Sequence, residues 1–501
     1  MKRRLVVGIL LASFIGGTLL RGFDLLASYE NGHRGACLAF FALMAKNHLR
    51  YGLSETGGVG VLNPDKVEPE YFNYYLHHPP GAILLATLAA YEAGTKPAGL
   101  RLAFLPLSVG IVFLLWRLAR PLGRLAATAA AAIAALAPIG VYYGAFVNFE
   151  IPTLFFMILA LARFQRFVNR GRPGDRLIAI LAQIAAVFCD WIALGLPLAL
   201  LVLLPFRTRR GADRAGRVRP IANALAMLVA SGVVVVFVQA WYALQLHRYG
   251  RSADGGGYYL DVTMLAKSFR FSEFLARQGE YLTNLFGWPF LALTVAGVGL
   301  LFRCRQRGGI DRTSLAAIAL SVVGVGNQVI LANNATGHDY YLLYLFPGAA
   351  LIASMPFSAA TRSRTQISRL AAPALVVLCG LLTANSVRVI GERREFAQSE
   401  FGKQIGDTTE PGSVVLQPYN FLLQVPVAAD RFVYHASDLK SFEDAKRFAV
   451  QFGMGGRPLV YLVGTEKEST LDPELRGYLA RRGNRSIKGP FVVFELGPLT
   501  L

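Results

Sequence analysis

The sequence predicts an α-helical protein that crosses a membrane about eleven times and carries a small α/β domain at its C-terminal end. Three observations predict this class. Hydrophobic residues make up 54% of the 501 positions and charged residues only 16%, against about 25% charged in an average soluble domain. Apolar runs such as residues 5–20 and 221–241 are long enough to be membrane spans, which need about 20 residues. Arginines cluster in short breaks between these runs.

The net charge of +20 raises the possibility of nucleic-acid binding, but the distribution of charge argues against it. Residues 391–501 hold 14 Lys and Arg and 14 Asp and Glu, so the whole excess lies in residues 1–390. There the basic residues occupy short breaks, as cytoplasmic loops do under the positive-inside rule. We therefore expect membrane lipids, and no nucleic acid, as partners. The four cysteines are scattered, with no disulfide framework and no CxxC metal pair.

The basic breaks determine the predicted topology. If all of them face the cytoplasm, the spans alternate between them, the N-terminus is cytoplasmic and the C-terminal domain is extracytoplasmic, with the chain in the cytoplasmic (inner) membrane. Basic residues before the first span would also suit a signal peptide, but no small-x-small cleavage site follows, so we expect a retained helix. The breaks are residues 2–4, 117–124, 163–176, 207–219, 303–312 and 362–369.

Three segments need separate treatment. Residues 81–94 are apolar but too short to cross, so we expect a helix that dips into the outer leaflet. Residues 177–206 carry Asp190 near their middle. A carboxylate at mid-bilayer costs roughly 2.5–3.5 kcal/mol, which favours two short spans hinged there. Residues 39–50 have helical, amphipathic spacing, and we expect them to lie along the membrane surface.

The predicted domains are a membrane domain, residues 1–390, and an α/β domain, residues 391–501. In the second domain, short β-type runs alternate with segments of helical spacing that end at glycine. No nucleotide-binding glycine motif occurs there, so we expect an accessory role. The β-type runs are residues 412–418, 431–436, 458–464 and 491–496, and the helical segments are 441–453 and 473–483.

Polar residues gather at the predicted outer turns, where they could share one pocket. Carboxylates at the boundary of water and lipid suit a general base or a divalent cation. Histidines and tyrosines beside them suit a phosphate. The catalytic candidates are Glu30 and Glu150, the second also a possible metal ligand, and the substrate-binding candidates are His33, His78, His338, Asp339 and Tyr341.

Each candidate also has a structural alternative. Glu30 and Glu150 could be solvated residues at helix ends, where a carboxylate near an N-terminus is favoured. Tyr341 could belong to the aromatic belt of a membrane interface. Asp190 with Trp191 suits a turn with an interface aromatic. The basic residues of the outer loop 242–287 suit a solvated amphipathic helix.

The order of these motifs resembles the membrane glycosyltransferases of the GT-C class, especially protein O-mannosyltransferases and lipid A aminoarabinose transferases. The stretch Glu30-Asn31-Gly32-His33 stands where mannosyltransferases carry Asp-Glu-x-His, and His78-Pro79-Pro80 matches their His-Pro-Pro stretch. Glu150 has the place of a second acidic residue, and residues 337–348 are similar to the entry of a late span. The chain departs from the pattern in having Glu30 for Asp and Asn31 for the second acid.

The resemblance implies an inverting transfer of a hexose or pentose from a polyprenyl-phosphate donor to a hydroxyl of a lipid, glycan or protein, at the outer face. It assigns Glu30 as the general base, and Glu150 as the group that orients the acceptor or holds a divalent cation. His78 and His338 would face the phosphate. Two alternatives remain open: a transporter or flippase of a lipid-linked sugar, and a polymerase or ligase of surface polysaccharide.

Overall fold

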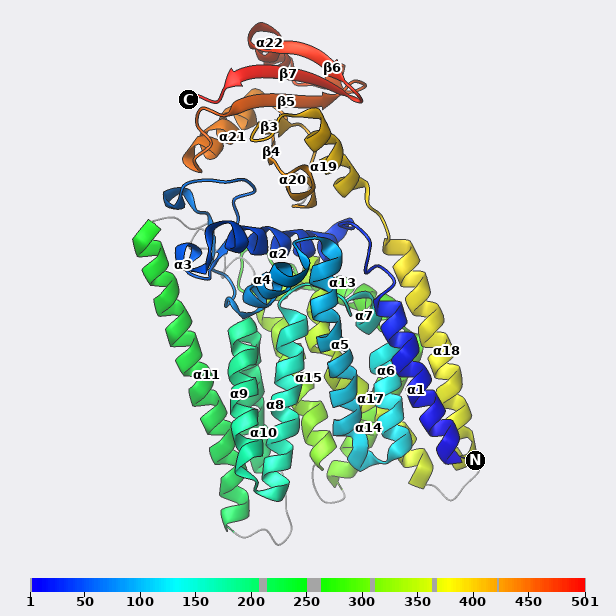
Figure 1. Ribbon diagram of the computed structural model, residues 1–501. Helices are drawn as coiled ribbons and strands as arrows, with labels where there is room; N and C mark the ends of the chain where they lie inside the picture. The colour runs from blue at the N-terminus through cyan, green and yellow to red at the C-terminus, as the bar shows by residue number, and fades with distance from the viewer. Residues whose placement is uncertain are drawn as a thin grey trace.

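The computed structural model describes residues 2–206, 214–249, 263–306, 311–362, 367–420 and 423–500. Figure 1 shows three layers: a bundle of long helices, a middle layer of short helices above it, and a C-terminal unit of strands and helices at the far end. The N-terminus lies at the opposite end of the bundle from the C-terminal unit.

The bundle consists of helices whose ends coincide with glycine, proline and basic residues. Gly171 adopts φ 66° directly after α8, and Pro173 opens α9 two residues later. Such a glycine–proline pair ends one helix and begins the next. The bundle helices are α1 (Lys2–Arg21), α5 (Pro97–Ala119), α6 (Arg124–Leu136), α8 (Glu150–Arg170), α9 (Pro173–Cys189), α10 (Gly195–Leu203), α11 (Arg214–Tyr249), α14 (Trp288–Gln306), α15 (Arg312–Ile330), α17 (Phe346–Arg362) and α18 (Ile367–Arg393).

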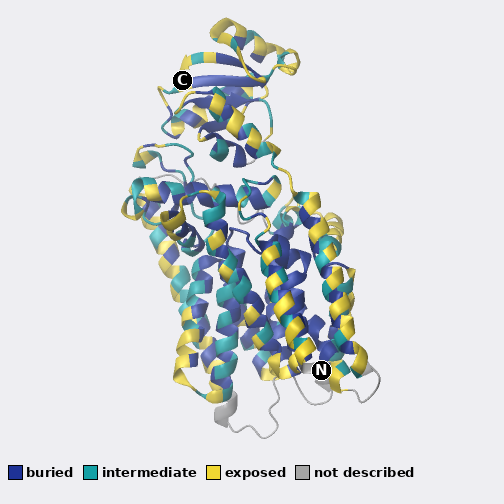
Figure 2. Ribbon diagram, turned by 45° about the vertical axis from the view of Figure 1, so that its right-hand side comes forward, coloured by how far each residue is buried: buried dark blue, intermediate teal, exposed yellow. Residues whose placement is uncertain are grey.

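The bundle has the composition of a membrane domain. Within the described ranges, six helices are long and apolar enough to cross a membrane, or seven if α13 and α14, bent by 107° at a short break, form one span. Exposed positions run along the outer faces of these helices in Figure 2. Many of them are large and apolar, as on α11 (Val233, Val236, Phe237), which suits contact with lipid. The sequence-based count of eleven spans stays a prediction.

The middle layer differs from one expectation. The amphipathic surface helix expected at residues 39–50 is α2 (Gly32–Tyr51), which is longer and largely buried, because other elements of the membrane domain pack against it and the C-terminal unit contacts it as well. Leu38, Phe41 and Met44 are among its buried residues. The other elements are α3 (Leu53–Thr56), β1 (Gly60–Val61), β2 (Tyr74–Tyr75), α4 (Gly81–Ala93), α7 (Pro138–Tyr142), α13 (Phe271–Leu285) and α16 (Ala332–Gly337).

The segment around Asp190 is broken, as the sequence predicts. Helix α9 ends at Cys189, a 3-10 turn covers Trp191–Leu194, and α10 begins at Gly195. The Asp190 carboxylate accepts a hydrogen bond from the Ile192 backbone N–H at 3.4 Å, so it caps the turn. The break brings Asp190 to the middle layer rather than into the bundle.

The C-terminal unit contains a five-stranded sheet in the order β4-β3-β5-β7-β6. Strand β3 pairs in parallel with β4 and β5, while β7 pairs antiparallel with β5 and β6. The polar strand β6, which the β-type patterns do not predict, forms an edge. The elements are α19 (Ala397–Thr408), β3 (Val414–Gln417), α20 (Gln424–Ala429), β4 (Phe432–His435), α21 (Leu439–Gln451), β5 (Pro458–Gly464), α22 (Pro473–Arg482), β6 (Asn484–Lys488) and β7 (Phe491–Pro498).

Candidate functional site

The loop between α1 and α2 places Glu30 in a buried network of charges. Its Oε2 accepts from Arg34 Nη1 at 3.1 Å and its Oε1 from Arg101 Nη2 at 3.2 Å, and its exposed fraction is 1%. Arg34 also donates to Asp24 at 3.0 Å. Burial raises the pKa of the Glu30 carboxyl, and the two arginines oppose the rise. A carboxylate has about four lone-pair sites, so each Glu30 oxygen keeps a second site beside its arginine partner.

The backbone around Glu30 is held closely. Gly32 has φ 76°, a left-handed conformation that favours glycine. A Cβ at Gly35 would lie 1.8 Å from the Glu30 carbonyl oxygen, so only glycine fits there. These two glycines turn the chain from the loop into α2 directly after the carboxylate.

Three of the predicted substrate-binding residues lie together beside this loop. His338 Nδ1 and His33 Nε2 are 2.8 Å apart, close enough for one imidazole to donate to the other. Burial lowers the pKa of both histidines, that of His338 to about 4, so the pair is neutral at pH 7. Asp339 accepts from Tyr143 Oη at 2.5 Å and from Arg393 Nη1 at 2.6 Å. Asp339 is therefore already paired with a tyrosine and an arginine.

His78 belongs to a second cluster, around Asp190. His78 Nδ1 lies 3.2 Å from Asp190 Oδ1, and Tyr344 donates to the other carboxylate oxygen. The His78 ring stacks on Phe149 at a centroid distance of 4.1 Å. The sequence analysis interpreted Asp190 as part of a simple turn. Its position as the lone charge in a long apolar run was the signal that could have indicated a site residue.

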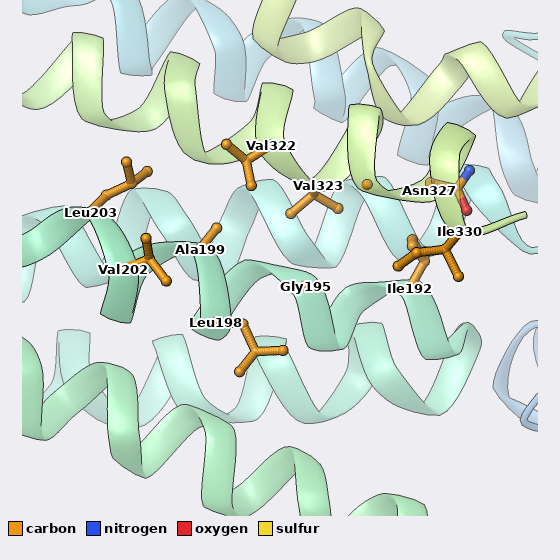
Figure 3. A pocket seen from close by; sticks show the side chains of 11 residues that line it. Ile192, Gly195, Leu198, Ala199, Val202, Leu203, Val322, Val323, Asn327 and Ile330 are labelled. Atoms are coloured by element: carbon orange, nitrogen blue, oxygen red, sulfur yellow. The ribbon is translucent and has the colours of Figure 1, made fainter.

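This second cluster borders a cavity of about 190 Å³. Tyr341, whose hydroxyl accepts from Asn334, faces the same cavity as His78 and Asp190. An apolar groove of about 260 Å³ runs from it between α10 and α15, and Ile192, Asn327 and Ile330 line both (Figure 3). The cavity, which has polar side chains among its lining residues, thus continues into an apolar groove along the bundle.

Glu150 begins α8 and is 3% exposed. Its Oε2 has no hydrogen-bond partner in the described part of the chain. No group of three or more His, Cys, Asp or Glu side chains that could hold a metal occurs within the described ranges. The predicted cation at Glu150 thus finds no ligand set there.

Several site residues escaped the sequence interpretation. Arg34, Arg101 and Arg393 pair with the candidate carboxylates, and Tyr143 and Tyr344 donate to Asp339 and Asp190. For the three arginines, the sequence offered one signal, a basic residue beside or within an apolar run. In the basic loop that the sequence predicts to lie outside, Arg277 pairs with Glu280 at 3.1 Å on the exposed side of α13, while Arg251 lies outside the described residues.

Comparisons with known proteins give a family match over part of the chain and similar folds. Residues 77–241 match the family model of dolichyl-phosphate-mannose-protein mannosyltransferases. ArnT from Cupriavidus metallidurans, solved with undecaprenyl phosphate, has a TM-score of 0.63 at 13% identity, over 98% of this chain and 97% of its own. The oligosaccharyltransferase AglB from Archaeoglobus fulgidus, solved with an inhibitory peptide and a dolichol-phosphate, has a TM-score of 0.58 at 14% identity, over 98% and 74%.

A structure of the same archaeal enzyme with Zn and sulfate has a TM-score of 0.57 at 13% identity, over 92% and 68%. A search of curated proteins by sequence found no match. At these identities the structures show the fold, and the family model adds the sequence relationship over part of the chain. The chain therefore has the fold of the GT-C membrane glycosyltransferases and resembles the O-mannosyltransferases and ArnT.

Proposed function

We propose that the chain transfers a sugar from a polyprenyl-phosphate donor to a hydroxyl of a lipid, glycan or protein at the outer face of the cytoplasmic membrane. The observation that carries this proposal is the apolar groove between α10 and α15 that opens into a cavity where polar side chains such as His78 and Asp190 gather. A polyprenyl phosphate has the same division, with an apolar tail and an anionic head. ArnT and AglB, which share the fold, were solved with lipids of this class.

In this proposal the tail lies in the groove and the phosphate lies beside His78 and Tyr341. Both side chains line the cavity and can donate hydrogen bonds to phosphate oxygens. The phosphate is the leaving group, so donors aimed at it stabilise the charge that develops as its bond to the sugar breaks. The neutral pair His33–His338 offers a further N–H group on the side of Glu30.

Glu30 is the proposed general base. The acceptor oxygen attacks the anomeric carbon from the face opposite the phosphate, its proton passes to the Glu30 carboxylate, and the bond between the anomeric carbon and the phosphate oxygen breaks. The sugar is thereby transferred with inversion and polyprenyl phosphate is released. A raised carboxyl pKa favours this role, because a stronger base accepts the proton more readily. Glu150, with a buried unpaired oxygen, orients the acceptor.

The groove can be tested by filling it. A Cβ at Gly326 would meet nothing within 4 Å, so Gly326→Leu places a side chain in the groove without a backbone clash. We expect undecaprenyl phosphate to bind the purified variant at least about tenfold more weakly. Gly299→Leu on α14, also free of contacts, is the matched control. If both variants bind undecaprenyl phosphate equally well, the groove is not the site of the lipid tail, and the proposed donor loses its main support.

The proposal includes the topology. We propose that all helices of the bundle cross the membrane, which gives about eleven spans when short apolar helices such as α6 (Arg124–Leu136) are counted. The N-terminus and the connections from α5 to α6 and from α8 to α9, at that end of the bundle in Figure 1, are then cytoplasmic, and the C-terminal unit is outside. A reporter after Arg210 should act as cytoplasmic and one after Gly391 as extracytoplasmic. A cytoplasmic C-terminus would put the site on the wrong side of the membrane for this donor.

A further inference from the structure

One buried side chain of the C-terminal unit reaches the backbone of the loop that carries Glu30. Gln424, at the start of α20, is fully buried. Its Nε2 donates to the backbone carbonyl of Glu30 at 2.9 Å and to that of Gly32 at 3.0 Å. The two hydrogens of one amide group thus hold the backbone carbonyls of the two residues on either side of Asn31.

Asn31 is held from the same side. Its backbone N–H donates to the Glu395 carbonyl at 2.6 Å, and its side-chain Oδ1 accepts from the Gln398 backbone N–H at 3.0 Å. Its Nδ2 lies 3.3 Å from a Glu395 carboxylate oxygen. An aspartate or glutamate at position 31 would have no hydrogen to donate and would repel Glu395. The amide at this position, where the O-mannosyltransferases carry an acid, fits the segment that leads into the C-terminal unit.

From below, the same peptide rests on α2. The Glu30 carbonyl lies so close to Gly35 that no Cβ fits between them. The loop therefore packs against α2 of the membrane domain on one side and accepts hydrogen bonds from the C-terminal unit on the other. The contact with Gly35 of α2 is local in sequence, whereas Gln424 lies 394 positions from Glu30 along the chain.

We propose that Gln424 is a positioning residue for the transfer reaction, through which the C-terminal unit sets the backbone and hence the carboxylate of Glu30. The inference rests on the proposed function in giving Glu30 a part in transfer. It makes the C-terminal unit part of the catalytic architecture rather than an independent accessory. Positioning matters because a displacement of about 1 Å at a reacting group can cost about 10²-fold in rate.

The test replaces Gln424 by methionine, which keeps the length and removes both donors. The matched control is Gln451→Met, on the exposed end of α21 in the same unit. Three quantities are measured on the full chain in lipid nanodiscs: hydrogen exchange of residues 29–35, affinity for undecaprenyl phosphate, and release of undecaprenyl phosphate from a panel of undecaprenyl-phosphate sugars with acceptors. Exchange of β5 reports whether the C-terminal unit is folded.

In Gln424→Met we expect the backbone amides of residues 29–35 to exchange hydrogen at least about tenfold faster, since two hydrogen bonds to the loop are lost. Transfer should fall about tenfold or more while undecaprenyl phosphate affinity stays within about twofold, because the donor cavity does not contain Gln424. The control should change none of these. A loop that stays protected while β5 is intact, or a loosened loop with normal transfer, would overturn the inference.

Failure of the proposed function gives a different pattern. It appears as a wild-type chain that transfers no sugar, or as normal transfer in Glu30→Gln. The exchange measurement then still decides whether Gln424 holds the loop, because it needs no substrate. A Gln424→Met variant with an unfolded β5 is replaced by Gln424→Ser, whose hydroxyl is too short to reach either carbonyl and which should therefore also speed the exchange of residues 29–35.

Discussion

Replacing Glu30 by glutamine tests the proposed base most directly, because the structure separates its catalytic role from its structural one. The carboxylate accepts from Arg34 at 3.1 Å and from Arg101 at 3.2 Å. A carboxamide keeps one acceptor oxygen and turns its NH₂ toward the other guanidinium. The loss is therefore one charge-assisted hydrogen bond, about 1.5–3 kcal/mol. Arg101 keeps three backbone carbonyl partners, which limits the damage.

Asp24→Asn is the matched control for that structural loss. Asp24 belongs to the same network, accepts from Arg34 at 3.0 Å and pairs with Arg394 at 3.2 Å. Its replacement removes a buried charge of the same sign from the same guanidinium. The two variants should therefore lose similar amounts of stability in thermal unfolding. Only the loss of the base should also remove catalysis.

We expect Glu30→Gln to slow transfer at least about 10²-fold, the lower range for general-base catalysis, with undecaprenyl phosphate affinity unchanged. Asp24→Asn should retain most of its turnover. In the wild type, turnover should fall as pH is lowered through the Glu30 pKa, which burial places above the ordinary 4.5. Near-normal turnover in Glu30→Gln, or an equal loss in Asp24→Asn, would refute the assignment and leave Asp24 or Glu150 as the base.

Three further outcomes follow from the same contacts. His78→Ala should weaken undecaprenyl phosphate binding about tenfold in a direct binding assay, while His435→Ala, exposed on β4, should not. Gly35→Ala should lower the thermal unfolding temperature, because its Cβ would meet the Glu30 carbonyl at 1.8 Å and such overpacking costs about 1–3 kcal/mol. The free energy of unfolding should also fall as pH is lowered from about 6.5 toward 4. In this range His338 takes up a proton in the unfolded state but not in the folded state, where burial lowers its pKa to about 4. A His338→Asn variant should show a shallower loss between pH 7 and 5, and an unchanged slope would contradict the assignment.

The class of the fold could be predicted from the sequence because it depends on local properties. The length of an apolar run and the basic residues at its ends are written in consecutive positions, and a bilayer selects for both. The break at Asp190 follows from the same reasoning, since one charge within an apolar run is enough to predict it. The order of Glu30, His78 and Glu150 along the chain was likewise sufficient to indicate the resemblance.

The partners of the candidate residues could not be predicted in this way. Arg101 reaches Glu30 from 71 positions away, and Arg393 reaches Asp339 from 54. Hydrogen bonds between distant residues depend on the packing of whole helices, which no local pattern encodes. For that reason the local pattern indicated only a turn at Asp190, whereas in the structure its carboxylate pairs with His78 and Tyr344.

The same division explains the burial of α2 and the place of the C-terminal unit. By composition, residues 39–50 suit a surface helix and the tail suits an independent domain. The tertiary structure lays one on the other and inserts Gln424 against the Glu30 loop. The sequence by itself determined which segments prefer lipid and which prefer water, because that preference belongs to each segment. Only the tertiary structure decided which polar groups meet, because a buried hydrogen bond needs two segments and a geometry that neither contains alone.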